Sequence, residues 1–246
     1  MAGVAAVGAV AVAAIESLTG LPDRSAELAA FGASVAECTR CPLAATRTQV
    51  VFGSGSPVAD LMFVGEAPGF HEDKQGVPFV GSAGQLLGKL LAEIGLSREQ
   101  VYIANVLKCR PPGNRDPQPD EIAACESHLF RQIELIGPRV VATLGNFATK
   151  LLSGRPDGIT KVHGRPQEVV LGGSRVTLFP IFHPAAALYT PRMLDVLRED
   201  FQRLPELLAP SEPRTLHAVP DEAAGAEPEP SPASGPEAAA IQLGLF

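Results

Sequence analysis

The sequence predicts a single α/β domain in which helices cover both faces of a mainly parallel sheet. Four short apolar runs, at 61–64, 101–107, 140–144 and 176–182, have the length and character of buried strands. Stretches with helical spacing of apolar residues lie between them. Strands that alternate with helices along a chain are typical of parallel sheets flanked by helices.

In the first half of the chain, capping residues and the positions of proline and glycine predict where the helices and loops lie. A helix is expected over 25–37, ahead of the first strand. The segment 82–94 carries a helical stripe of leucines, with Gly81 or Ser82 as its cap. Prolines and glycines fill most of the segment before it, so 66–81 is predicted to be a loop.

The second half continues the alternation of helices and strands. A helix capped by Asp120 is expected to run to Ile136, and another is expected over 147–152, after the third strand. A short strand at 169–170 should pair with the last strand around the Gly-Gly turn at 172–173.

A last helix over 191–208 completes a domain predicted to span 25–208. Before it lies an apolar extension, 1–24, whose first fifteen residues contain no Lys or Arg and are short for a membrane span. After it, 209–246 is rich in Pro, Ala, Glu and Ser and is expected to be disordered. Nothing marks the chain for secretion, so a cytoplasmic protein is expected. A monomer is expected as well.

The net charge of −7 does not argue against a nucleic-acid partner, because it is unevenly distributed. Residues 25–205 contain 18 Lys or Arg and 18 Asp or Glu, whereas 206–246 contain seven acids and one Arg. Within the neutral part, Lys108, Arg110 and Arg115 form a local basic cluster.

Four cysteines indicate a metal site. Cys38 and Cys41 form a CxxC pair, and Cys109 and Cys125 lie 16 residues apart. In a cytoplasmic chain this pattern favours metal binding over disulfides. Thiolates select zinc or an iron–sulfur cluster, and the spacing alone leaves both possible. We expect a structural site that ties the N-terminal segment to the region 109–125.

Polar residues stand where the predicted strands end. Glu66 follows the first strand within Gly65–Gly69, Asn105 and Gly145 lie at the ends of the next two, and His183 ends the last. In an open parallel sheet, ligands bind at the carboxyl ends of the strands. These residues are therefore expected to meet in one site, although each alone has an ordinary structural explanation.

Taken together, four motifs within the cysteine frame closely resemble family 4 uracil-DNA glycosylases, the iron–sulfur type, over residues 34–205. They are Gly65-Glu-Ala-Pro-Gly69, Pro78-Phe-Val-Gly-Ser-Ala-Gly84, Asn105-Val-Leu-Lys-Cys-Arg-Pro-Pro112 and His183-Pro184. The resemblance implies a three-layer fold with a four-stranded parallel sheet. It also implies a [4Fe–4S] cluster on the four cysteines and hydrolysis of the bond between uracil and deoxyribose, which leaves an abasic site.

The resemblance also assigns roles to individual residues. Phe79 would stack on a uracil flipped out of the duplex, and the amide of Asn105 would read its N3–H and O4. Ala67 would contribute a backbone amide. His183 would stabilise the negative charge on uracil O2, and Glu66 would orient water or stabilise the sugar cation. A role for Glu72 is less certain, because it is equally well explained as a solvated loop charge.

Contacts with DNA are expected from small residues near the strand ends. Ser82, Gly84 and Gly145 would touch phosphates. The segment 184–191 corresponds to the loop that enters the duplex, with Leu188 as the wedge. Tyr189 stands where relatives often have Arg, which puts that contact in doubt. His163 is expected to serve packing.

The C-terminus resembles the peptide by which bacterial replication proteins bind the sliding clamp. Its residues are Gln242, Leu243, Leu245 and Phe246. A disordered acidic linker would present the Gln and the apolar side chains to a preformed groove.

Three other functions are weighed against the glycosylase. A non-catalytic iron–sulfur DNA-binding protein, associated with the clamp, would not need the complete set of Glu66, Phe79, Asn105 and His183. A self-cross-linking relative would carry a basic insert with a His after Asn105, and none is present. A nucleotide-using metabolic enzyme is disfavoured because GxGxxG and a P-loop lysine are missing.

Overall fold

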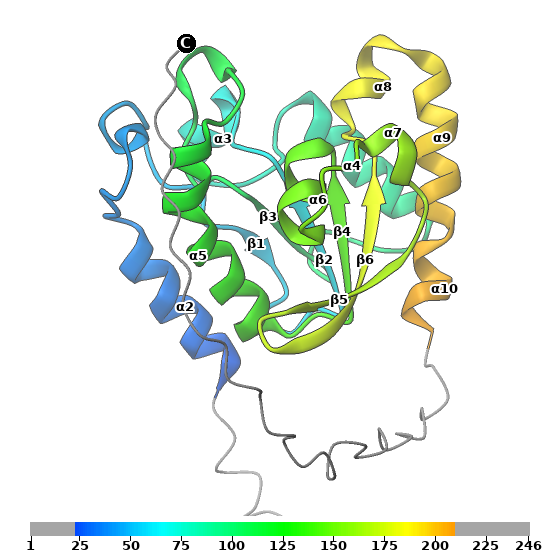
Figure 1. Cartoon of the computed structure of the whole chain (residues 1–246), viewed down its shortest axis with the longest axis horizontal. Helices are drawn as coiled ribbons and strands as arrows, with labels where there is room; N and C mark the ends of the chain where they lie inside the picture. The colour runs from blue at the N-terminus through cyan, green and yellow to red at the C-terminus, as the bar shows by residue number, and fades with distance from the viewer. Residues whose placement is uncertain (1–22, 210–246) are drawn as a thin grey trace, which may run out of the picture. The chain divides into compact units, whose positions relative to one another are not determined.

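The structure is a computed structural model that describes residues 23–209 (Figure 1). The predicted N-terminal extension and C-terminal tail, with the clamp-binding peptide, therefore lie outside the described residues, apart from 23–24 and 209 at their inner ends. None of the helices within 23–209 has the length and apolar character needed to cross a membrane.

The centre of the domain is a six-stranded sheet in the order β1-β3-β2-β4-β6-β5. Four strands are parallel to one another, namely β3 (Tyr102–Asn105), β2 (Leu61–Gly65), β4 (Val140–Leu144) and β6 (Ser174–Ile181). The edge strands β1 (Ser54–Gly55) and β5 (Gln167–Leu171) are antiparallel to their neighbours. The predicted four-stranded parallel sheet is present, but each edge carries an additional strand.

Helices cover both faces of the sheet. They are α2 (Arg24–Val35), α3 (Phe70–Gln75), α4 (Ser82–Glu93), α5 (Pro119–Ile136), α6 (Asn146–Ser153), α7 (Ile159–Val162), α8 (Ala185–Tyr189), α9 (Pro191–Gln202) and α10 (Leu204–Leu208). Two short 3₁₀ turns, η1 (Pro42–Ala45) and η2 (Pro112–Asn114), lie in connecting segments. Figure 1 shows α2 beside α5 at one side of the domain and α9 with α10 at the other.

The alternation of side chains along β2 separates the two halves of the core. Met62 and Val64 pack with apolar residues of α2 and α5, whereas Leu61 and Phe63 pack with those of α4 and α9. Successive side chains of a strand point to opposite faces, so a continuous apolar strand must be covered on both. The three-layer α/β fold is thereby confirmed.

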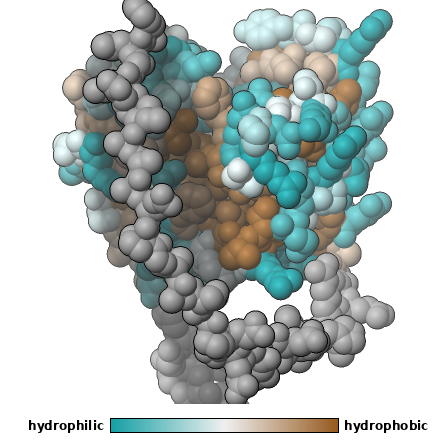
Figure 2. All heavy atoms as spheres, viewed as in Figure 1, coloured by the Kyte–Doolittle hydropathy of each residue, from teal (hydrophilic) through white to brown (hydrophobic). Residues whose placement is uncertain are grey.

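The β5–β6 hairpin lies at the edge of the sheet. Its turn residues, Gly172 and Gly173, have positive φ angles of 56° and 77° and allow the predicted tight connection. Figure 2 shows apolar residues over this hairpin, where Val170 is 68% exposed. The strands before and after the turn are longer than predicted.

Three details of the helices differ from the predictions. Asp120 does not cap α5: Gln118 does, in a capping box with Glu121, and Pro119 occupies the first turn. The last helix is two helices, α9 and α10, because Pro205 cannot continue the hydrogen bonding of α9. Within the predicted loop 66–81, α3 forms one short helix that ends at Gly76.

Candidate active site

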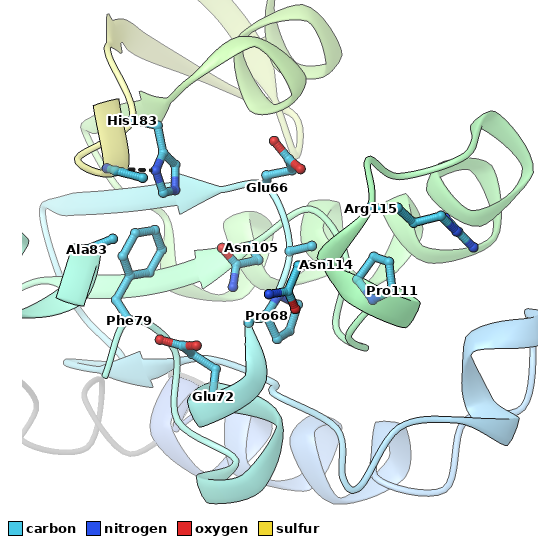
Figure 3. A pocket seen from close by; sticks show the side chains of 13 residues that line it. Glu66, Pro68, Glu72, Phe79, Ala83, Asn105, Pro111, Asn114, Arg115 and His183 are labelled. Atoms are coloured by element: carbon cyan, nitrogen blue, oxygen red, sulfur yellow. Dashed lines mark hydrogen bonds between the residues drawn. The ribbon is translucent and has the colours of Figure 1, made fainter. Parts of the chain in front are cut away.

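A cavity of about 370 Å³ opens at the carboxyl ends of the parallel strands (Figure 3). Segments that follow β2, β3 and β6 line it, together with residues near the start of α4. The residues predicted to bind uracil or to act in catalysis all line it: Glu66, Ala67, Phe79, Asn105 and His183. Of the strand-end residues expected to meet, Glu66, Asn105 and His183 line the pocket, whereas Gly145 does not. Ala67 and Phe79 were expected there because of the family resemblance.

Burial raises the pKa of Glu66 to about 6, and the negative charge of Asp116 adds to the effect. Glu66 directly follows β2 and is half-buried. Within residues 23–209 its carboxylate has no hydrogen-bond partner, so it remains available to a ligand or a water molecule. A carboxylate with a pKa near 6 can accept a proton at neutral pH.

His183 is held as a neutral imidazole with a defined tautomer. The backbone N–H of Ala185 donates to Nδ1 over 3.2 Å, so the ring proton resides on Nε2 (Figure 3). Burial lowers the pKa of His183 to about 4, and the opposing effect of Glu72 is smaller. At neutral pH the ring therefore offers one N–H donor.

Phe79 forms the wall beside His183. The two rings are stacked with their centroids 5.6 Å apart and their planes 30° apart. Phe79 is buried, and its φ of 55° lies in the left-handed region, which is rare for a residue with a side chain. An aromatic face at this position could stack on a planar ring in the pocket.

Asn105 ends β3 with its side chain buried at the bottom of the pocket. A Cβ atom on Gly65 would lie 2.5 Å from Asn105 Oδ1 and 2.6 Å from Phe79 Cζ, so glycine is required at that position. Within the part of the chain that the structure describes, no hydrogen bond occupies the Asn105 amide. Both of its polar atoms are free to read a ligand.

The residues predicted to contact DNA lie around this pocket in different settings. Ser82 is exposed at the start of α4, and Leu188 is 43% exposed on α8 beside Tyr189, which is 87% exposed. Gly145 packs against His183. Gly84 is buried, and a Cβ there would lie 1.8 Å from the carbonyl oxygen of Phe79, which explains this glycine without DNA. The DNA contacts stay predictions.

Asn114 and Arg115 at the pocket, and Phe70 on α3, were not predicted as site residues, although Arg115 was expected to belong to a basic cluster. Asn114 and Arg115 line the pocket from the Pro/Gly-rich loop after β3, where the strand-end rule could have found them. The exposed Phe70 on α3 carries two cations over its ring, Lys74 at 4.6 Å and Arg110 at 5.2 Å. The helix α3 has only six residues, too few to show a helical spacing of apolar residues in the sequence.

His163 lies apart from the pocket, as expected for a packing residue. Its Nδ1 is 3.1 Å from Oδ2 of the buried Asp200, and its ring packs against Phe182.

The four cysteines are free thiols in one neighbourhood. Cys109 and Cys125 are buried, and Cys38 and Cys41 are half-buried. The backbone N–H of Lys108 donates to Cys125 Sγ over 3.3 Å. Burial raises the pKa of Cys109 to about 11, against the opposing effect of Arg47, and the neighbouring Cys125 and Cys41 raise it further.

Two further side chains, both unpredicted, approach the cysteine sulfurs. Arg47 donates to Cys109 Sγ over 3.5 Å and to the carbonyl of Cys38 over 2.6 Å, and His128 Nε2 lies 3.4 Å from Cys38 Sγ. Within residues 23–209, no three metal-ligating side chains converge closely enough to hold a single ion. The donor set is four soft sulfurs with N–H groups directed at them, which fits thiolate ligands of a multinuclear cluster.

Comparison with known proteins identifies the family. The model of the uracil-DNA glycosylase superfamily matches residues 52–205. A type-4 uracil-DNA glycosylase of Sulfurisphaera tokodaii is 49% identical over 178 residues, which cover 70% of this chain and 81% of that protein. The Archaeoglobus fulgidus protein of the same name is 46% identical over 183 residues, which cover 73% and 92%.

A third type-4 uracil-DNA glycosylase, from Thermotoga maritima, is 52% identical over 155 residues, which cover 63% of this chain and 79% of that protein. The matched region contains the pocket and the strands that build it. The chain therefore belongs to the uracil-DNA glycosylase superfamily and, within it, to the type-4 uracil-DNA glycosylases.

Proposed function

We propose that this chain removes uracil from DNA in base excision repair. It flips the uracil nucleotide out of the helix and hydrolyses the bond between uracil N1 and deoxyribose C1′, leaving an abasic site. The observation that carries the proposal is the convergence of Glu66, Phe79, Asn105 and His183 in a cavity of about 370 Å³. The names of the relatives support the same activity.

Recognition of uracil would rest on stacking and on one amide. The flipped base would lie against Phe79, with N3–H donating to Asn105 Oδ1 and with Asn105 Nδ2 donating to O4. Cytosine presents an acceptor at N3 and a donor at N4, so the same amide orientation would reject it. The unoccupied Asn105 amide and the absence of a side chain at Gly65 support this arrangement.

Bond cleavage would depend on stabilising the departing base. As the C1′–N1 bond breaks, its electron pair moves onto uracil, and negative charge develops at O2. The Nε2–H of His183 would donate to this oxygen, and the backbone amide of Ala67 would also bind the base. A donor already oriented by Ala185 strengthens its bond in the transition state, which lowers the barrier.

Glu66 would act on the sugar side of the reaction. Its carboxylate would either orient water for attack on C1′ and accept the proton, or stabilise the positive charge that develops on the sugar. A pKa of about 6 leaves most of the group ionised at neutral pH, as both roles require.

The rim of the pocket would bind the DNA strand. Backbone amides at Ser82, Gly84 and Gly145 would contact phosphates, and Leu188 would enter the space that the base leaves. Arg110 and Lys74, held over the ring of Phe70, would add positive charge beside the same strand.

Cys38, Cys41, Cys109 and Cys125 would hold a [4Fe–4S] cluster. The cluster would supply bonds that tie the segment before β1 to the start of α5, and no step of the reaction uses it. Arg47 and Lys108 N–H groups directed at the sulfurs support thiolate ligands there.

The C-terminal peptide would recruit the enzyme to a bacterial sliding clamp. The enzyme would act as a monomer in the cytoplasm, at the nucleoid. Deletion of Leu245 and Phe246 is expected to abolish clamp binding and to leave uracil excision from short duplexes unchanged. Surface plasmon resonance against immobilised clamp measures the first, and an excision assay measures the second. Equal clamp affinity with and without the two residues contradicts the recruitment.

An alkali-cleavage assay tests the activity itself. A labelled duplex with one uracil is incubated with the protein and then heated in alkali, which breaks the strand at abasic sites. We expect cleavage at the uracil position and none in the matched duplex with thymine. No cleavage above the protein-free control would return the chain to the class of non-catalytic DNA-binding proteins.

A further inference from the structure

The backbone of Phe79 has a conformation that its neighbours must maintain. Its φ of 55° is one of two positive values among the non-glycine residues described, the other being that of Asn114. A residue with a Cβ atom adopts this region only when surrounding contacts outweigh the steric cost. The ring that would stack on uracil therefore depends on whatever holds this backbone.

Arg98 holds the carbonyl side of the segment. Its Nη1 donates to the carbonyl oxygen of Phe79 over 3.0 Å, and its Nη2 donates to that of Pro78 over 2.7 Å. Arg98 is half-buried in the connection between α4 and β3 and does not line the pocket. Within residues 23–209 it forms no ion pair, so both bonds serve these two consecutive carbonyls.

Glu72 holds the amide side of the same segment. Its Oε1 accepts from the N–H of Val80 over 2.9 Å and from that of Gly81 over 2.8 Å. Figure 3 shows the Glu72 carboxylate directed toward the segment that carries Phe79. The segment 78–81 is thus held between a cation on its carbonyls and an anion on its amides.

Two glycines leave the space that the backbone and ring of Phe79 occupy. The absence of a side chain at Gly84 lets α4 approach the Phe79 carbonyl, since a Cβ there would lie 1.8 Å from it. At Gly65 the same absence gives room to the ring itself. Rotation of the peptide after Phe79 would break the bond from Arg98. Relaxation of the positive φ of Phe79 would move its ring relative to His183, on which it stacks.

We propose that Arg98 is a positioning residue of the uracil site: its two-pronged contact with Pro78 and Phe79 fixes the stacking face of Phe79. This inference rests on the proposed glycosylase function. A lysine cannot replace the arginine, because one ammonium does not reproduce two parallel N–H donors in a plane. A ring misplaced by about 1 Å is expected to cost about 100-fold in rate.

Arg139 provides a matched control. It makes the same kind of contact, with Nη1 donating to the carbonyl of Leu208 and Nη2 to that of Ala209, each over 2.9 Å. It precedes β4 and therefore lies at the opposite ends of the strands from the pocket. Arg139→Lys removes a paired guanidinium contact with two consecutive carbonyls and leaves the contacts of Phe79 unchanged.

The experiment compares Arg98→Lys, Arg98→Gln and Arg139→Lys in single-turnover excision of uracil and in inhibition by free uracil. For the Arg98 variants we expect excision to fall about 10- to 100-fold and inhibition by uracil to weaken. Affinity for undamaged DNA should stay unchanged. Arg139→Lys should match the wild type in all three. Circular dichroism establishes that each variant is folded.

A double-mutant cycle with Phe79→Ala separates positioning from general stability. If Arg98 acts through the ring, Arg98→Lys should add little to the loss caused by Phe79→Ala. Independent, multiplicative losses would overturn the proposal, as would wild-type rates in Arg98→Lys or loss of the fold in both Arg98 variants. An inactive wild-type chain would overturn the proposed function itself, and this inference with it.

Discussion

At the scale of single residues, burial in one pocket shifts the pKa values of two ionisable groups in opposite directions. It raises the pKa of Glu66 to about 6 and lowers that of His183 to about 4, because it penalises the charged form of each. The imidazole is consequently neutral over the whole physiological range, whereas the carboxylate titrates near its lower end. The pocket keeps a neutral donor on one side and a proton acceptor on the other.

These pKa values predict the pH dependence of excision. If the ionised Glu66 is the active form, the single-turnover rate should rise with pH through about 6 and level off above it. His183 should add no limb between pH 5 and 8, since it stays neutral there. Rates measured from pH 5 to 8 check this. In Glu66→Gln the rate should be lower and independent of pH across this range, and a limb that persists in the variant would contradict the assignment.

At the scale of elements, the strands could be predicted and the short helices could not. Buried parallel strands are continuous apolar runs, so the sequence predicted β2, β3, β4 and β6. The residues at their ends could be predicted with them. The helices α3 and α8 have six and five residues, too few for a helical period. The predicted cap of α5 was wrong because the helix begins at Pro119, where Gln118 and Glu121 form the capping box.

Arg110 allows a prediction at this scale, because it connects the loop after β3 with α3 through Phe70. Arg110→Gln should weaken binding of undamaged DNA and reduce the slope of log K against log salt by about 0.7–0.9, the loss of one phosphate contact. Arg131→Gln is the control, since Arg131 pairs with Glu134 on α5. Equal slopes for the Arg110 variant and the wild type would exclude Arg110 from the DNA interface.

At the scale of the whole molecule, the four cysteines lie on the segment that follows α2, on the loop after β3 and on α5. Their order along the sequence predicted a metal site, but not its surroundings. Arg47 and His128 reach the sulfurs from positions that no spacing rule indicates, because the fold alone brings them together. The choice between zinc and a cluster likewise depends on the geometry of the sulfurs and on the family.

Replacement of one proposed cysteine ligand tests whether the protein binds a cluster. Cys109→Ser should lose iron and the brown colour of the protein, and its melting temperature should fall, because binding of a cluster to the folded state alone stabilises that state. Iron analysis and thermal unfolding measure the effect, with Arg131→Gln as a folded control. A variant with full iron content, or a colourless wild type with bound zinc, would contradict the cluster.

Release of free uracil, measured by mass spectrometry, tests whether the strand-end residues form a uracil-excising pocket. Duplexes that differ in one base, uracil, cytosine or thymine, are incubated with the wild type, His183→Ala and Asn105→Ala. We expect the wild type to release uracil alone. The rate should fall about 100- to 1,000-fold in His183→Ala and by orders of magnitude in Asn105→Ala as well. Undiminished release in both variants, or no release by the wild type, would contradict this assignment of the pocket.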